Sequence, residues 1–358
     1  MIDQILELLP SQCTFAQAQD FLRAHGLPHS APNWRSLIEE RFRPAVATEG
    51  GVSEAELLAF LREMEEHGGQ HVLLYEMTNA TLLRRLFRSK FVETRFAGLN
   101  GIPALGAVVF PEAHEKPRIF DIRRDRRGAH ATLVLKLALM RERHVFIGNE
   151  ERGGGRYARV FEKQPYRAVN VVRFCESGLC EVRIRAHERN FGYEHEANAM
   201  LSLIGGLAPR EALSELSLTG LKDMIFDSHL REDFDGEVML KTSKHSVPDG
   251  PVMALSIGSA ESHLLEHQNA IDGLRAFRTG HSDVRADRVG FWVVQRIEPA
   301  DDEEQEERRF LKVELADSLN EFILSQNIDR AAYESIFAVI AENARKAVDK
   351  ARTGRHTS

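Results

Sequence analysis

The hydrophobic periodicity of the chain changes near residue 101, and this change restricts the fold more than any other feature of the sequence. Before it, apolar residues recur every three to four positions, as they do on one face of an α-helix. The segment 14–25 places Phe15, Ala18 and Leu22 on one face and stops at Gly26. The first part of the chain is therefore predicted to be helical.

Residues 1 to about 80 are predicted to form a small helical bundle, because short connections separate the helical segments. Ser53 followed by Glu56 has the spacing of a capping box and opens a helix that continues through Leu61. The helical spacing of apolar residues also predicts a further helix from about Leu73 to near Phe91.

Between Gly101 and His187 the period falls to two, which predicts β-strands. The clearest signal is a hairpin of residues 169–174 and 180–184 with Gly178 in its loop. Consecutive strands of this kind predict an antiparallel meander, and alternating Arg and apolar residues in CEVRIRAHE predict that one face is exposed to water. The predicted strands are 118–123, 132–139, 144–147, 157–161, 168–174 and 180–185.

Helical and strand signals alternate in the remaining residues, which predicts a second unit of mixed structure. The predicted helices are 193–207, 209–226, 260–277 and 330–352, and the predicted strands are 236–242, 252–257, 289–296 and 309–314. We therefore predict an α+β protein with a helical N-terminal bundle, a central antiparallel β-meander and a C-terminal α+β domain. The predicted domain limits are 1–80, 81–190 and 191–358.

Composition excludes several classes of protein. The 358 residues are 43% hydrophobic, which is enough for a sizeable core. No apolar run approaches the roughly 18 residues of a transmembrane helix, and the first ten residues lack the basic region of a signal peptide. Three cysteines are too few for a disulfide framework and favour a reducing compartment. We therefore expect a soluble, cytoplasmic protein without a membrane partner.

The net charge of −7 argues against nucleic acid as a partner until its distribution is considered. Residues 1–80 hold 5 basic and 12 acidic side chains, residues 81–190 hold 23 and 12, and residues 191–358 hold 19 and 30. The middle segment therefore carries +11 between acidic flanks of −7 and −11. A local basic excess of this kind is typical of nucleic-acid binding.

We therefore predict a non-catalytic protein that binds nucleic acid, DNA in particular, through the phosphate backbone. No base-reading helix is indicated, so sequence readout is not expected. Arginine forks bind phosphate bidentately, and the chain has 37 Arg against 10 Lys. The predicted phosphate ligands are Arg84, Arg85, Arg88, Lys90, Arg123, Arg124, Arg126, Arg127, Arg152, Arg156, Arg183 and Arg185.

This hypothesis predicts that charge reversal of Arg124, Arg126 and Arg127 abolishes duplex binding. Two alternatives remain open. The arginines could pair with acidic residues nearby or in the flanks, or they could bind an acidic protein partner, which would make the chain an adaptor. A protein partner or self-association through the C-terminal half is expected in any of these cases.

A third alternative is a metal-dependent hydrolase. His263, Glu266 and His267 match the H-x-x-E-H pattern, in which a helix presents two zinc ligands and a general base on one face. This pentapeptide resembles that of the pitrilysin-type peptidases, and the resemblance implies Glu342, which lies at a similar spacing, as a third ligand. Zinc is expected only under this alternative, and no cofactor otherwise.

The order of elements resembles that of the centromere protein N/Chl4 family over about residues 10–230. The segments that carry this resemblance are FLRAHGLPH, WRSLIEERFR, GVSEAELLAFLREMEEHGGQHVLLYEM, TLVLKLAL, KQPYRAVNVVRF, LSLIGGLA and GLKDMIFD. The resemblance implies a death-fold-like helical domain joined to a basic β-domain, without enzymatic activity, that binds DNA or nucleosomes and docks a related partner through its C-terminal half. It lies in pattern and order, so it assigns no individual contact residue. The excess of Arg over Lys is typical of GC-rich bacterial genomes, in which a centromere protein would be out of place. The resemblance is therefore expected to reflect a shared architecture, in a bacterial DNA-handling or defence setting.

Overall fold

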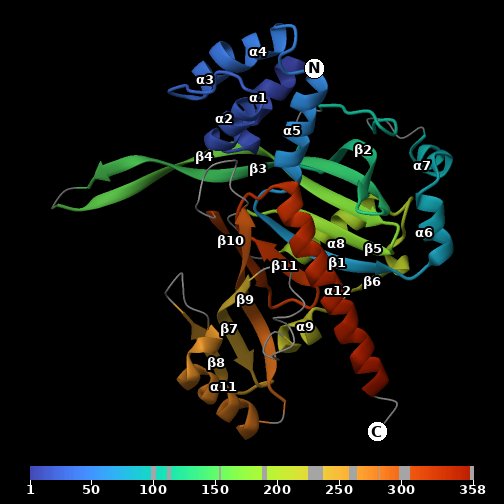
Figure 1. Ribbon diagram of the computed structural model, residues 1–358, viewed down its shortest axis with the longest axis vertical. Helices are drawn as coiled ribbons and strands as arrows, with labels where there is room; N and C mark the ends of the chain where they lie inside the picture. Colours follow the sequence, from blue (N-terminus) through green and yellow to red (C-terminus); the bar gives the residue numbers. More distant parts are fainter. Residues whose placement is uncertain are drawn as a thin grey trace.

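The fold was analysed in a computed structural model, which describes residues 1–97, 102–110, 114–152, 155–187, 192–224, 237–257, 264–281, 283–297 and 307–354. It confirms the α+β class, with a helical N-terminal region beside a large antiparallel sheet (Figure 1). Within the described residues, no helix has the length and apolar character needed to cross a bilayer.

The N-terminal helices form their own core, and local signals set where they begin. Capping boxes are present at Thr14 and Ser53, as the sequence predicts for Ser53. Leu9, Leu22 and Leu61 are buried between the helices. The elements are α1 (Ile2–Gln12), α2 (Phe15–Ala24), α3 (Trp34–Leu37), the π-helical turn η1 (Ile38–Phe42), α4 (Arg43–Ala47) and α5 (Glu54–Glu66).

Among the described residues, the rest of the molecule is built on one eleven-stranded sheet whose pairings are all antiparallel. The strand order is β2-β3-β4-β5-β1-β11-β10-β9-β7-β8, with β6 paired to β1. The strands are β1 (Gln70–Met77), β2 (Arg118–Arg127), β3 (His130–Glu151), β4 (Tyr157–Cys175), β5 (Leu179–Arg185), β6 (Leu213–Glu215), β7 (Glu237–Ser246), β8 (Val252–Ser256), β9 (Arg285–Ile297), β10 (Glu307–Leu315) and β11 (Glu321–Leu324).

Strand β1 corrects the helix expected from Leu73 to Phe91. Residues 70–77 pair with both β5 and β11, and only two of the eight residues are partly exposed. A short apolar run buried on both faces has no alternation, so periodicity cannot distinguish it from a helix. Because β1 connects the two halves of the sheet, the helical unit ends at α5 and the sheet crosses the expected limits at 80 and 190.

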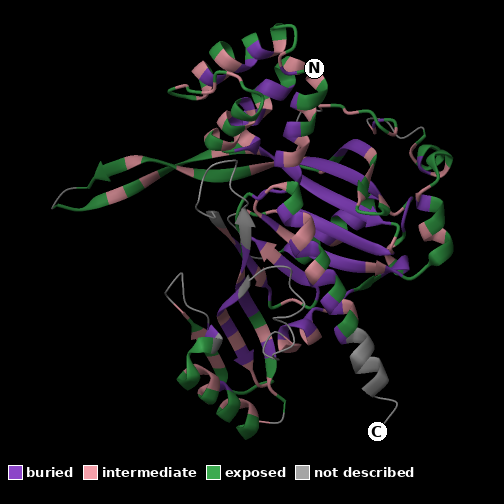
Figure 2. Ribbon diagram, in the orientation of Figure 1, coloured by how far each residue is buried: buried purple, intermediate pink, exposed green. Residues whose placement is uncertain are grey.

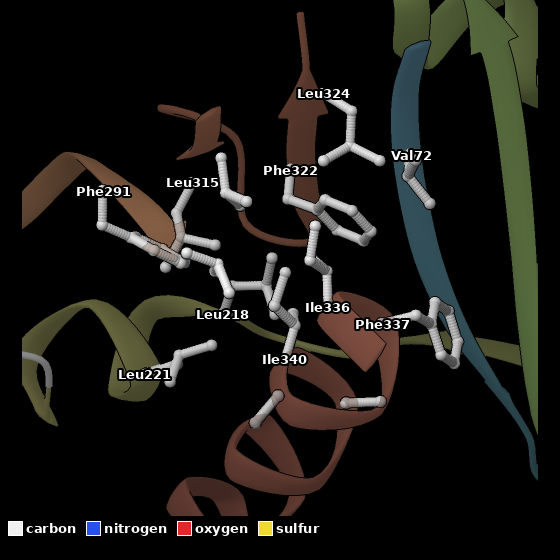
Figure 3. Packing of buried hydrophobic residues seen from close by; sticks show 14 of the residues in the cluster. Val72, Leu218, Leu221, Phe291, Leu315, Phe322, Leu324, Ile336, Phe337 and Ile340 are labelled. Carbon is white, nitrogen blue, oxygen red and sulfur yellow. The ribbon is translucent and has the colours of Figure 1, made fainter. Parts of the chain in front are cut away.

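Helices cover both faces of this sheet. The short helices α6 (Ala80–Leu86) and α7 (Ser89–Phe96) lie together with α8 (Tyr193–Leu203) on one face, where Leu86, Val92 and Met200 are buried. On the C-terminal half, α9 (Thr219–Met224) and α12 (Arg330–Gly354) enclose a second core around Phe291 and Phe322 (Figure 3). Of the helix predicted over 209–226, only α9 is α-helical, because the segment before it contains the 3₁₀ turn η2 (Arg210–Ala212) and β6; residues 225–226 lie outside the described residues. The remaining elements are η3 (Leu264–Glu266) and α11 (Gln268–Gly280).

The prediction of a water-exposed sheet face at β5 is also wrong. Val182 and Ile184 pack into the core beneath α6 and α8, whereas Arg183 and Arg185 point to the opposite face, which α1, α5 and α12 cover. Figure 2 shows the strands of this region buried almost throughout.

The hairpin of β3 and β4 extends well beyond the sheet. Its four predicted strands are fused into two strands of 22 and 19 residues. Strand β2 pairs with β3 only as far as Ala138, and β5 pairs with β4 only from Val171 onward. The distal ribbon projects from the body as an exposed two-stranded arm (Figures 1 and 2). We use the name β3–β4 arm for residues 141–166.

Candidate nucleic-acid interface

A large share of the basic excess of residues 81–190 lies inside the molecule. Glu181 on β5 accepts hydrogen bonds from Arg127 Nη2 at 2.6 Å and from the Tyr333 hydroxyl at 2.5 Å, and it pairs with Arg173 and Arg183. The side chains of Arg173 and Arg183 are 2% and 0% exposed. A buried guanidinium requires a carboxylate partner because desolvation is costly, and Glu181 supplies it to three strands at once.

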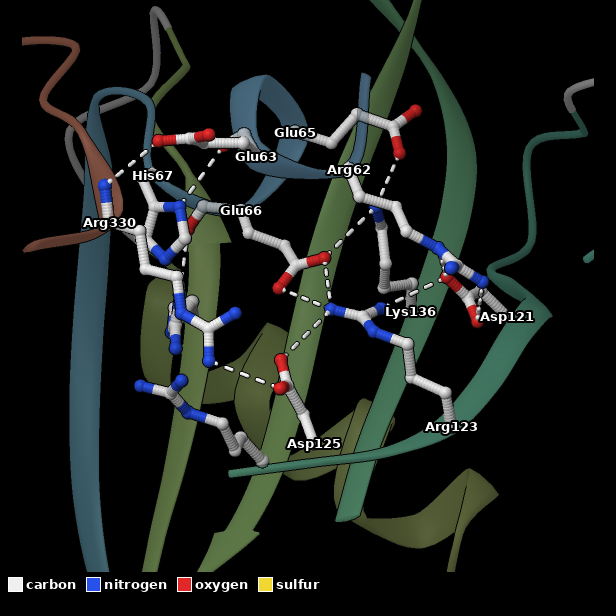
Figure 4. A network of polar contacts seen from close by, with 12 residues as sticks. Arg62, Glu63, Glu65, Glu66, His67, Asp121, Arg123, Asp125, Lys136 and Arg330 are labelled. Carbon is white, nitrogen blue, oxygen red and sulfur yellow. Dashed lines mark hydrogen bonds and ion pairs between the residues drawn. The ribbon is translucent and has the colours of Figure 1, made fainter. Parts of the chain in front are cut away.

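A second set of ion pairs joins α5 to the same sheet face (Figure 4). Lys136 Nζ lies 2.5 Å from Glu65, which also pairs with Arg167. Glu66 accepts two hydrogen bonds from Arg123 Nη2, at 2.6 and 2.7 Å. Burial alone would raise the pKa of Glu66, but the charges of Arg123 and Lys136 outweigh it and hold the pKa well below its usual range. Glu66 is therefore ionised at neutral pH and neutralises these cations.

Four predicted phosphate ligands are consequently removed from the candidate interface. Arg123, Arg127 and Arg183 belong to the interior ion-pair network described above. Arg185 donates from Nη1 to Gln12 Oε1 at 2.6 Å and from Nη2 to the Ser11 carbonyl at 3.2 Å, which attaches α1 to the sheet. These four side chains have interior partners because the N-terminal helices and α12 pack on the sheet face that was predicted to be exposed to water.

Six predicted residues remain exposed around α6 and α7. The Asn79 side chain caps α6, and Leu86 and Val92 are buried against the sheet, so the basic positions of both helices face outward. Arg124 Nη2 donates to the Phe87 carbonyl, which joins the edge strand β2 to the end of α6. We use the name helix-pair patch for the exposed residues Arg84, Arg85, Arg88, Lys90, Arg95, Arg124 and Arg126.

No residue of the helix-pair patch forms an ion pair with a described residue. The guanidinium groups of Arg85 and Arg95 instead lie 4.5 and 5.3 Å from the centroid of the Phe91 ring. Arg95 is the member that the sequence analysis missed. Its position four residues after Phe91, on the same helix, is the signal that indicates it.

Arg152 and Arg156 lie at the tip of the β3–β4 arm, on the other side of the molecule from α6 and α7 (Figure 1). Both side chains are exposed, and the backbone amide of Arg152 donates to the Arg156 carbonyl at 2.8 Å. Arg143 and Arg159, which were not among the predicted ligands, are also exposed on the arm. The predicted single basic surface is therefore two separate surfaces, the helix-pair patch and the arm.

The geometry does not support the metal-site alternative. His263 lies outside the described residues. Leu264–Glu266 is a separate 3₁₀ turn and His267 is the non-helical N-cap of α11, so Glu266 and His267 do not share a continuous helical face. Among the residues that can be described, no group of three His, Cys, Asp or Glu side chains is arranged to hold a metal ion.

In the described part of the chain, the helix-pair patch and the arm are thus the two surfaces whose exposed cations could bind a ligand. The patch offers seven cations on two helices and a strand edge, and the arm adds four more on a projecting ribbon. No protein-family model matches the chain, and no curated protein is significantly similar to it.

Proposed function

We propose that the protein binds nucleic acid through the phosphate backbone and that the helix-pair patch is the main contact surface. One observation carries this proposal. When the ion pairs of the described residues are assigned, seven exposed cations of the patch are left without a carboxylate partner. Exposed guanidinium forks of this kind match the geometry of phosphate oxygens.

The composition of the two helices supports the same conclusion. Residues 80–97 contain five basic side chains and a single carboxylate, that of Glu93. A face that served only to keep the protein soluble would be expected to mix both signs of charge. The excess of one sign favours a polyanionic ligand, and phosphate groups, which carry no base information, are the groups that such cations bind.

A non-catalytic role fits the other features of the chain. The order of helical N-terminal region, basic strands and C-terminal half corresponds to the architecture implied by the resemblance to the centromere protein N/Chl4 family. On this basis the protein acts as a binding module within a complex, and the C-terminal half is the part through which a protein partner would dock.

The test is fluorescence anisotropy with a labelled duplex, measured across a series of salt concentrations. The variant combines Arg84→Glu, Arg88→Glu and Arg126→Glu, which changes three exposed side chains without touching the interior network. Arg127 is left unchanged, because a Glu side chain at this position would face Glu181 in the interior. We expect at least a tenfold loss of affinity, since each phosphate contact contributes about 0.9 to the salt slope and three are removed.

A matched control combines Arg35→Glu, Arg285→Glu and Lys312→Glu. These residues are exposed, form no ion pair with a described residue and lie outside α6 and α7. The control has the same change in net charge, so it should retain most of the affinity if the patch is the contact surface. Equal losses of duplex affinity in the patch variant and the control, or salt-independent binding by the native protein, would refute the proposal. Recovery of an acidic protein partner that survives nuclease treatment would favour the adaptor alternative.

A further inference from the structure

The β3–β4 arm carries an unusual concentration of exposed apolar side chains. Of the nine large hydrophobic residues that are exposed in the described part of the chain, four lie on this arm. They are Phe146, Ile147, Tyr157 and Phe161, with exposed fractions of 50%, 58%, 69% and 50%. Clusters of exposed apolar residues that charged side chains surround typically mark binding sites.

Three of these residues are aromatic and share one face of the ribbon. Phe146 and Phe161 are direct cross-strand partners, with ring centroids 5.7 Å apart and ring planes at 64°. Because side chains alternate along a strand, Tyr157 and Arg159 are on the same face as Phe161. Along β4 this face therefore presents an aromatic, a cation and an aromatic, at intervals of about 7 Å.

The arm is exposed because the described chain offers nothing to cover it. Beyond Ala138 and Val171, the outer edges of β3 and β4 have no strand partner in the described residues, and the two strands pair only with each other. A two-stranded ribbon is at best marginally stable in water. Exposed aromatic rings add an unfavourable hydration term that binding would remove.

The charges on the arm indicate what kind of ligand it binds. Arg143, Arg152, Arg156 and Arg159 are exposed and form no ion pair with a described residue. The exposed cation Lys163 does have a partner, since its Nζ lies 3.4 Å from Glu142. An apolar protein groove would have to desolvate four unpaired guanidinium groups, which is unfavourable. A nucleic acid supplies phosphates for the cations and planar bases for the rings.

We propose that the β3–β4 arm binds single-stranded nucleic acid by stacking unpaired bases on Phe146, Phe161 and Tyr157. The four arginines contact the backbone of the same strand. Unpaired bases are required because bases in a duplex are stacked on each other and do not present their faces to a protein ring. This inference rests on the proposed function, in that both involve nucleic acid, but it assigns a different ligand to a different surface.

The experiment compares three labelled probes by fluorescence anisotropy: a single DNA strand of about 20 nucleotides, an abasic strand of the same length, and a duplex. The abasic strand has the same backbone charge and no bases to stack. The native protein is expected to bind the normal single strand at least tenfold more tightly than the abasic strand, because stacking of each base contributes about a fivefold to hundredfold gain in affinity.

The matched variants separate stacking from simple hydrophobicity. Phe146→Leu with Phe161→Leu keeps the apolar character and removes the rings, so single-strand affinity should fall about tenfold or more while duplex affinity is unchanged. Phe146→Trp with Phe161→Trp keeps an aromatic ring at both positions, so this variant should bind the single strand as tightly as the native protein. Leu203→Ala with Val252→Ala removes exposed apolar side chains elsewhere and should have no effect.

The possible failures are distinguishable. Equal affinity for the normal and abasic strands would overturn the stacking inference and leave the backbone proposal intact. Undiminished single-strand binding by the leucine variant would also overturn it and would point to an apolar protein partner for the arm. If no probe binds at all, both proposals are wrong.

Discussion

The interior ion-pair network and the helix-pair patch draw their cations from the same segment of the chain, residues 81–190, and use them differently. In the network, carboxylates from α5, α12 and β5 face the arginines of the sheet. In the patch, seven cations face water with no carboxylate partner among the described residues. Two neighbours on β2 show the contrast most directly, since Arg123 bonds to Glu66 and Arg124 bonds to the carbonyl of Phe87.

Within β2, strand alternation rather than local charge density divides the arginines between the two roles. Successive residues of β2 point to opposite faces of the sheet. One face is covered by α5 and the start of α12, and there a cation must be neutralised. The other face borders α6, and there the side chain can reach a ligand. Each role predicts its own response to mutation.

The largest effect is expected in the network. Glu181→Gln would leave Arg173 and Arg183 buried without their shared carboxylate, and we expect the free energy of unfolding to fall by about 3–5 kcal/mol. Urea denaturation would measure this loss. Glu162→Gln on the exposed arm is the control and should change stability by no more than about 0.5 kcal/mol. A loss below about 1 kcal/mol for the Glu181 variant would mean that the network does not hold the fold together.

The second prediction compares the neighbours on β2. Arg123→Ala should destabilise the protein by about 2 kcal/mol, because Glu66 and Asp121 lose a partner but keep Lys136 and Arg62. Arg124→Ala should leave stability within about 0.5 kcal/mol of the native value and weaken nucleic-acid binding instead. Urea denaturation and fluorescence anisotropy of both variants would test this division of roles. Similar losses of stability in the two variants would contradict it.

The third prediction concerns pH and His67, the buried C-cap residue of α5, whose ring centroid lies 5.2 Å from that of Tyr333. Burial, and secondarily the Arg183 charge, lowers the pKa of His67 to about 3. The unfolded chain, with an ordinary histidine pKa, therefore takes up a proton below about pH 6.5 that the folded chain does not, and stability falls as the pH decreases through this range. The depressed carboxylate pKa values add to the loss only nearer their unfolded pKa of about 4.5.

Replacement of His67 by Gln should therefore reduce the loss of unfolding free energy between about pH 7.5 and 5.5 by about 1 kcal/mol. Urea denaturation at the two pH values gives the difference, whatever the variant does to absolute stability. The exposed His130, replaced by Gln, is the control and should leave the pH dependence unchanged. An identical pH dependence in the His67 variant and the native protein would show that His67 does not titrate differently on folding.

The smallest effect is expected for a single residue of the patch. Arg88→Ala should change stability by less than about 0.5 kcal/mol and reduce the salt slope of duplex binding by about 1. The loss of affinity should be similar for duplexes of unrelated sequence, because a phosphate contact carries no base information. A loss confined to one sequence would show that Arg88 reads bases.

Local signals in the sequence predicted much of the fold. The Ser53–Glu56 capping box, the β4–β5 hairpin around Gly178 and the long C-terminal helix are all present. The prediction failed where an element is buried on both faces, as in β1, because burial from two sides removes the alternation that identifies a strand. It also divided the β3–β4 hairpin into four short strands, since nothing local shows that a ribbon continues beyond the sheet.

By itself, the sequence determined where the capped N-terminal helices begin, which segments alternate as strands, and that residues 81–190 carry a basic excess, because these properties depend on residues a few positions apart. Only the tertiary structure decided which cations are free to bind a ligand. One carboxylate that holds Arg123 lies 57 positions away, and one that holds Arg173 lies 161 positions away. Folding brings these acidic groups onto one face of the sheet, and it leaves α6, α7 and the β3–β4 arm outside their reach.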